Sequence, residues 1–74
     1  MLLPGKIIGG KAMDGKKLQD KMTEKKMTQK MLGDRVGVSQ QMITRIVTGS
    51  KQPSLMLAKE IANVLGCTVD ELLS

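Results

Sequence analysis

The side chains with the greatest capacity for hydrogen bonding cluster in the middle of this 74-residue chain, in the stretch TQKMLGDRVGVSQQMITRIVTGSKQPS, residues 28–54. Glutamine can pair bidentately with adenine and arginine with guanine, while a hydroxyl group both donates and accepts. The chemistry that these residue types offer is therefore recognition through hydrogen bonds. An ordinary solvated helix face is the simpler interpretation, and the surrounding elements must decide between the two.

Residues for covalent or metal chemistry are scarce. The chain has no histidine, one cysteine and no glycine-rich phosphate loop of Walker type. Without a histidine beside it, Cys67 has no metal or catalytic partner, and we expect it to pack as a small apolar side chain. We therefore expect no cofactor, no bound metal and no enzymatic activity.

The composition predicts one small domain with an adaptable core. Hydrophobic residues make up 41% of the chain, but Phe, Trp and Tyr are absent, so Leu, Ile, Val and seven Met must fill the core. A single cysteine forms no internal disulfide, and the sequence has neither a signal-peptide pattern nor an apolar run long enough to cross a bilayer. We expect a cytoplasmic protein that makes no contact with membranes.

The net charge of +5 is unevenly spread. Lysines outnumber acidic residues over residues 1–30, whereas acidic residues outnumber the single lysine over 54–74. This asymmetry suits a polyanion on one side of the molecule, although surface lysines also serve solubility.

Capping residues and apolar spacing predict an all-α domain of five helices. We expect helices at about 15–26, 28–36, 39–49, 54–66 and 68–73. The expected N-caps are Asp14, Thr28, Ser39 and Ser54, and the expected C-terminal glycines are Gly37, Gly49 and Gly66. Thr68 and Glu71 have the spacing of a capping box at the start of the last helix.

The first twelve residues do not follow this pattern. They contain three Gly and a Pro without helical period, so residues 1–12 are expected to be an arm outside the domain at 13–74. Within the arm, residues 7–10 (IIGG) could form a short edge strand. A second hypothesis places the natural start at Met13, because Gly9-Gly10 can be encoded GGA-GGT, a ribosome-binding sequence.

The centre of the stretch meets the demands of two closely crossing helices. Such helices need a small residue at the crossing, here Gly33, and a turn residue that accepts positive φ, here Gly37. A glycine inside a helix costs about 1 kcal/mol against alanine, so close packing is the expected compensation at Gly33. The inner apolar residues are Leu32, Val38, Ile43 and Ile46. The stretch therefore predicts a helix-turn-helix.

The same stretch resembles the helix-turn-helix of the phage repressor and Cro family, whose usual pattern is T-Q-x-x-L-A-x-x-x-G-V-S-x-x-x-I-S followed by G-x-x-x-P-S. The matching residues are Thr28, Gln29, Leu32, Gly37, Val38, Ser39, Ile43, Gly49, Pro53 and Ser54. Through IANVLGCTVDELL the resemblance extends over residues 14–73 and implies a five-helix, lambda-repressor-like domain.

Two departures from the family pattern occur as a pair. Many members have an arginine in place of Met22 and a glutamate in place of Val47, joined in a partly buried ion pair. Replacement of both partners by apolar residues is often neutral or stabilising, so the fold should survive. We predict that Met22 and Val47 are in contact.

The resemblance also implies the roles of the polar residues. The third helix would enter the major groove and read bases with Ser39, Gln40, Gln41, Thr44 and Arg45. The ends of the second and third helices would hold phosphates through Gln29, Lys30, Thr48, Ser50, Lys51 and Gln52.

The function that the resemblance implies is that of a small prokaryotic or phage transcriptional regulator. It would bind a palindromic operator in double-stranded DNA as a homodimer and act, like a repressor, by occupying a promoter. Because the sequence ends with this domain, induction is expected to need another protein, such as an antirepressor, or proteolysis. Two alternatives stay open: the antitoxin of a toxin-antitoxin pair, and a protein-protein adaptor that keeps the fold without an operator.

We expect the homodimer to form through the C-terminal segment. Val69, Leu72 and Leu73 lie on an element that is short for all three to be used in one small core, so apolar surface should be left for a partner. Acidic residues in this third of the chain would be repelled by phosphate, which places the segment away from the DNA.

Overall fold

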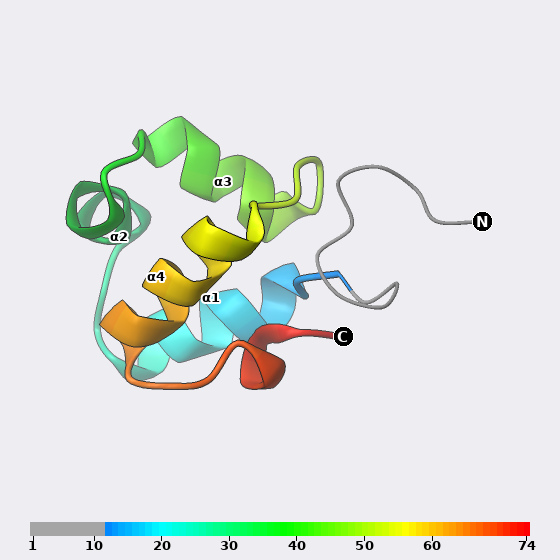
Figure 1. The fold of residues 1–74 in the computed structure, drawn as a ribbon. Helices are drawn as coiled ribbons and strands as arrows, with labels where there is room; N and C mark the ends of the chain where they lie inside the picture. The colour runs from blue at the N-terminus through cyan, green and yellow to red at the C-terminus, as the bar shows by residue number, and fades with distance from the viewer. Residues whose placement is uncertain (1–11) are drawn as a thin grey trace.

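The computed structural model describes residues 12–74, and four α-helices make up most of that range (Figure 1). The elements are α1 (Gly15–Glu24), α2 (Gln29–Val36), α3 (Gln40–Thr48), α4 (Leu55–Leu65) and the 3-10 turn η1 (Asp70–Leu72). Over these residues the expected all-α class is confirmed, and the β-structure among them is one isolated bridge between Met13 and Leu73. The suggested strand at residues 7–10 lies outside the described residues.

Local capping signals set the ends of the helices, as expected. Each α-helix follows an N-cap whose side chain accepts a hydrogen bond from a backbone N–H group of the first turn: Asp14, Thr28, Ser39 and Ser54. Helices α2, α3 and α4 end at glycines with φ of 79°, 84° and 71°. These values lie in the left-handed region, where a side chain is disfavoured.

The prediction of a helix at 68–73 is wrong, because only the three-residue 3-10 turn η1 forms there. Its capping box is present: the N–H of Thr68 donates to Glu71 Oε2 over 2.8 Å, and the N–H of Glu71 donates to Thr68 Oγ1 over 3.3 Å. Leu73 then turns to an extended conformation, with φ −88° and ψ 150°, and pairs with Met13 instead of continuing the helix. Helix α1 also ends two residues before the expected position, since Lys26 adopts a φ of 56°.

The core lies between all four helices and η1. Its fully buried large side chains are Leu18, Met22, Leu32, Ile43, Ile46, Ile61, Leu65 and Leu72. Met22 is completely buried, and Val47 is partly buried against the same cluster. Both apolar replacements of the family's ion pair are thus accommodated in the core, while their direct contact stays a prediction.

The two ends of the described chain are joined in what we call the terminal clasp, residues 12–14 with residues 72–74 (Figure 1). The N–H of Asp14 donates to the Leu72 carbonyl over 2.8 Å, and the N–H of Ser74 donates to the Ala12 carbonyl over 3.0 Å. Lys17 Nζ adds a 2.8 Å hydrogen bond to the Leu73 carbonyl. The clasp closes the core, because Met13 and Leu73 are only 3% and 4% exposed.

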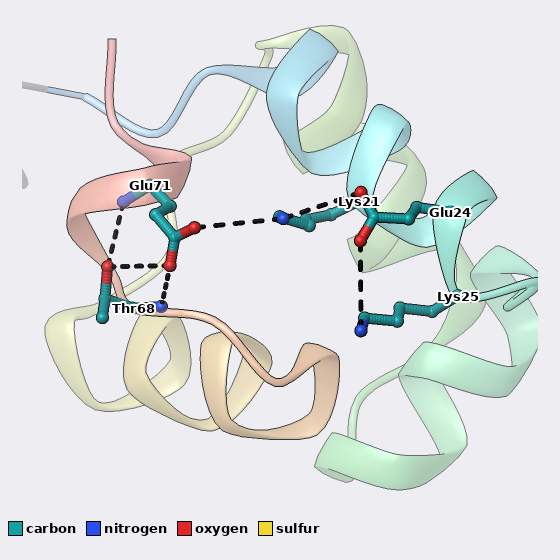
Figure 2. Close-up of polar contacts among 5 residues, drawn as sticks. All are labelled: Lys21, Glu24, Lys25, Thr68 and Glu71. Carbon is teal, nitrogen blue, oxygen red and sulfur yellow. Dashed lines mark hydrogen bonds and ion pairs between the residues drawn. The ribbon is translucent and has the colours of Figure 1, made fainter.

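Glu71 links η1 to α1 on the face shown in Figure 2. Its carboxylate lies 3.9 Å from Lys21 Nζ, and Lys21 also lies 3.7 Å from Glu24. The hydrogen bonds from the backbone N–H and hydroxyl of Thr68 hold the pKa of the Glu71 carboxyl below its ordinary value, and Lys21 lowers it further. None of the helices in residues 12–74 has the length and apolar character needed to cross a membrane.

Candidate nucleic-acid interface

Helices α2 and α3 approach so closely at their turn that the backbone leaves no room for a side chain at Gly33. The N–H of Val38 donates to the Gly33 carbonyl over 2.9 Å. A Cβ atom on Gly33 would lie 2.7 Å from the Val38 carbonyl oxygen and 3.2 Å from that of Ser39. The close packing expected at this glycine is therefore confirmed.

A second close approach, at Gly15, was not anticipated from the sequence. A Cβ atom on Gly15 would lie only 1.9 Å from the carbonyl oxygen of Val47, near the C-terminal end of α3. The backbone of the first residue of α1 thus packs directly against the backbone of α3. The available signal was a glycine immediately after an N-cap, where no turn requires one.

The outward face of α3 is polar and exposed. Ile43 and Ile46 are completely buried on its inner side, whereas Gln40, Gln41 and Arg45 are exposed on the other side. Among residues 12–74, the side chains of these three make no hydrogen bond or ion pair with another residue. Helix α3 contains no acidic residue. Three of the five expected base-reading residues are therefore available to an external partner.

The remaining two expected base-reading residues are engaged within the protein. Ser39 Oγ accepts the N–H of Met42 over 3.1 Å as the N-cap of α3. Thr44 Oγ1 donates to Gln29 Oε1 on α2 and also lies 3.1 Å from the Gln40 carbonyl oxygen. The structure thus brings Thr44 together with Gln29, a residue expected to contact phosphate.

The other expected phosphate-binding residues lie around the ends of α2 and α3. Lys30 is exposed and forms an ion pair of 3.2 Å with Asp34. Thr48 and Ser50 direct their hydroxyl groups to the Arg45 carbonyl oxygen, at 3.2 Å and 3.3 Å. Lys51 is exposed in the loop that follows α3. Phosphate binding by these residues stays a prediction.

Gln52 has a role in the fold that the sequence did not indicate. Its Oε1 accepts the N–H of Met13 over 2.8 Å and thereby ties the loop between α3 and α4 to the terminal clasp. The side chain is half-buried. Its amide oxygen is therefore occupied, and only the amide nitrogen could contact a phosphate.

The C-terminal segment does not leave the apolar surface that was expected for a dimer interface. Leu72 and Leu73 are 0% and 4% exposed, because the terminal clasp buries them in the core of this chain. Val69 is half-buried against the same core. The expectation of unused apolar surface at this segment is thus wrong. In the described range, the large hydrophobic residues that are exposed are Met31, Leu55 and Met56.

No metal site is formed by residues 12–74, where no three Cys, Asp or Glu side chains are grouped suitably. Cys67 is half-buried and packs against the core, as expected of a small apolar side chain. Burial raises the pKa of its thiol, and the nearby Glu71 carboxylate raises it further.

Comparison with known proteins relates this arrangement to a protein family. A family model described as Helix-turn-helix matches residues 18–72. No curated protein matches the chain.

Solved structures of a larger protein contain a similar fold. One is the structure of hydroxypropylphosphonic acid epoxidase from S. wedmorenis, which superimposes on this chain with a TM-score of 0.73 and 24% sequence identity. The match covers 85% of this chain and 35% of the epoxidase chain. Crystal structures of apo-HppE and of FeII HppE have TM-scores of 0.74 and 0.73, with identities of 24% and 22%, over 85% and 81% of this chain. The chain spans about a third of the length of each of these proteins: the match covers 36% of the apo-HppE chain and 32% of the FeII HppE chain. At these identities the similarity concerns the fold alone.

Proposed function

The chain belongs to the helix-turn-helix family of the phage repressor and Cro type, and from this premise we propose that it is a transcriptional regulator that binds double-stranded DNA sequence-specifically. Its activity would be binding without catalysis. A repressor-like mode, in which the bound protein occupies a promoter, is part of the proposal.

The outward face of α3 is the observation that carries this proposal. It combines exposed amide and guanidinium groups, which match the hydrogen-bonding pattern of adenine and guanine in the major groove. The side chains of Gln40, Gln41 and Arg45 make no hydrogen bond or ion pair with the rest of the described chain, so base contacts by them would break none. We assign base reading chiefly to these three residues.

Close backbone packing at both ends of α3 supports the same function. Gly33 lies against the turn before α3, and Gly15 lies against the backbone near its C-terminal end. Recognition by several hydrogen bonds needs side chains on a helix whose position does not vary. The two backbone contacts meet that need at both ends of α3.

The electrostatic part of the proposal rests on the residues around α3. Lys30 is exposed in the first turn of α2 and Lys51 in the loop after α3, and α3 carries one Arg without an acidic residue. Phosphate contacts by lysines raise affinity for all DNA sequences and make binding salt-dependent. We therefore propose that Lys51 contributes affinity and Arg45 contributes sequence preference.

Selection of bound sequences from random double-stranded DNA tests the function directly. We expect one sequence motif to be enriched, and gel-shift titrations on that motif should show a steep loss of affinity with increasing salt. Arg45→Ala should lower specific binding by roughly 1 to 3 kcal/mol and relax preference at one position. Lys51→Ala should weaken binding to all sequences and reduce the salt slope by about one unit.

Lys25→Ala is the matched control for both variants. It removes one positive charge from the face shown in Figure 2, where Lys25 lies 3.9 Å from Glu24. Its DNA affinity should stay close to that of the wild type. Failure to enrich any motif would reject sequence-specific binding and favour an adaptor, whereas equal losses for Arg45→Ala on specific and random DNA would remove Arg45 from the reading residues.

We also propose that a homodimer binds a palindromic operator, since this motif commonly binds two half-sites one helical turn apart. Leu72 and Leu73 are buried in the single chain, so we place the interface on another surface. Sedimentation of the protein on the selected DNA should give two chains per operator. One chain per operator would contradict the dimer and leave the proposed DNA binding intact.

A further inference from the structure

A series of hydrogen-bonded side chains runs from α1 through α2 to α3, and we call it the Gln19–Gln29–Thr44 chain. Gln29 Nε2 donates to Gln19 Oε1 over 3.4 Å, and Thr44 Oγ1 donates to Gln29 Oε1. At its far end, Gln19 Nε2 donates to Thr23 Oγ1 over 3.3 Å. Polar side chains of three helices thus determine the orientation of a residue on the outward face of α3.

The two ends of the Gln29 amide have different partners, which fixes its orientation. The amide oxygen can only accept, and it faces the hydroxyl of Thr44. The amide nitrogen can only donate, and it faces the oxygen of Gln19. A flipped amide would set its oxygen against the Gln19 oxygen and lose the hydrogen bond to Gln19.

The hydroxyl of Thr44 has a single hydrogen and two acceptors beside it, Gln29 Oε1 and the Gln40 carbonyl oxygen at 3.1 Å. That hydrogen is therefore not available to the acceptor atoms of a base, such as N7 of a purine or O4 of thymine. Thr44 is nonetheless exposed on the outward face of α3. Its oxygen can still accept a hydrogen bond from a base amino group, and its Cγ2 methyl suits apolar contact with the C5-methyl group of thymine.

We propose that Thr44 recognises the methyl group of one thymine in the operator, and that Gln29 is its positioning residue. This inference rests on the proposed function and specifies the chemistry of one reading position. It departs from the sequence-based expectation that Thr44 reads a base through its hydroxyl. Gln29 acts by holding the hydroxyl away from the base.

Two variants of nearly equal size separate the methyl from the hydroxyl. Thr44→Ser keeps the hydroxyl and removes the methyl, whereas Thr44→Val keeps a methyl and removes the hydroxyl. Dissociation constants are measured on the selected operator and on copies in which each thymine in turn is replaced by uracil, which lacks the C5-methyl group. Melting temperatures of the free proteins confirm that each variant is folded.

For the wild type, we expect uracil at one position to weaken binding by about fourfold, the factor that burial of one methyl-sized group produces. Thr44→Val should keep this ratio, and Thr44→Ser should lower it to about one at that position alone. An unchanged ratio in Thr44→Ser, a ratio near one in Thr44→Val, or no thymine preference in the wild type would each overturn the assignment. A selection without any enriched motif would instead reject the proposed function itself.

The positioning role of Gln29 is tested by the same ratio. Gln29→Met has a similar length but no acceptor. It removes the hydrogen bond that joins Thr44 to α2 and leaves only the Gln40 carbonyl of α3 to hold the hydroxyl, so the Thr44 side chain is less firmly oriented and the thymine-to-uracil ratio should fall. Gln29→Glu keeps an acceptor oxygen and should restore the ratio, although its negative charge weakens binding to all DNA. An unchanged ratio in Gln29→Met would show that Gln29 does not position Thr44.

Discussion

The α2–α3 unit and the terminal clasp are held in place by different kinds of contact. At α3, the decisive contacts are between backbones, made possible by Gly33 at one end and Gly15 at the other. In the clasp, buried apolar side chains and backbone hydrogen bonds join segments from the two ends of the described chain.

This difference shows how a small domain can vary the side chains of its proposed reading face while the helix that carries them stays in place. Because close backbone contacts at Gly33 and Gly15 position α3, the outward side chains that make no internal hydrogen bond, Gln40, Gln41 and Arg45, can differ without moving the helix. The clasp has no such freedom, since Met13, Leu72 and Leu73 are all needed to close the core. Substitutions in the two regions should therefore differ in their effect on stability.

The largest effect is expected in the clasp. Leu72→Asp would place a charge in a completely buried site, and the cost of several kcal/mol is comparable to the whole stability of a small domain. We expect the variant to be unfolded by circular dichroism. Met56→Asp is the control, because Met56 is 73% exposed and this variant should melt near the wild type. A cooperative transition for Leu72→Asp near that of the wild type would show that the clasp is dispensable.

The next largest effect is expected at the first glycine contact. Gly15→Ala would bring a Cβ atom to 1.9 Å from the Val47 carbonyl oxygen, so the backbone of α1 or α3 must move. We expect a loss of about 3 kcal/mol, at the upper end of usual overpacking costs, measured by urea unfolding. Lys16→Ala, at the neighbouring exposed residue, is the control, and its free energy of unfolding should differ little from that of the wild type. Equal stability of the two variants would mean that α1 does not constrain α3.

A smaller loss is expected at the second glycine contact. Gly33→Ala would place a Cβ atom 2.7 Å from a backbone oxygen, but alanine also favours the helix by about 1 kcal/mol. The net loss in unfolding free energy should be about 1 kcal/mol, with Arg35→Ala on the exposed side of α2 as the control. Since alanine is usual here in the phage repressor and Cro pattern, a gain in stability would show that the turn can relax.

The smallest effect concerns Glu71, beside the clasp, and it appears only in acid. Because the pKa of its carboxyl is lowered in the folded chain, its contribution is fully present above the ordinary pKa of a glutamate. It is lost as the pH falls through the lower pKa of the folded state. Glu71→Gln should therefore show a shallower decline of unfolding free energy with acid than the wild type.

Glu60→Gln is the matched control for this measurement, because it removes the same charge from α4 outside the capping box. Its decline in acid should be compared with that of Glu71→Gln under identical salt. Coincident curves for the wild type and Glu71→Gln would contradict a role for the Thr68 hydrogen bonds in acid stability.

Signals between residues close in sequence were sufficient to predict four helices and the helix-turn-helix. Asp14, Thr28, Ser39 and Ser54 each begin a helix because an N-cap bonds to the turn that directly follows it. The glycines at 37, 49 and 66 end helices for an equally local reason, their positive φ. The outward position of Gln40, Gln41 and Arg45 follows from helical periodicity alone.

Only the tertiary structure decided which polar side chains already have a hydrogen-bond partner inside the protein and which glycines lie against α3. The bond of Thr44 to Gln29, that of Gln52 to Met13, and the contact of Gly15 with Val47 each join residues far apart in sequence, and no local pattern encodes them. The same holds for η1, since the competing pairing of Leu73 with Met13 comes from the other end of the described chain. Propensity and capping act within a few residues, whereas burial and hydrogen-bond partners depend on how the helices are brought together.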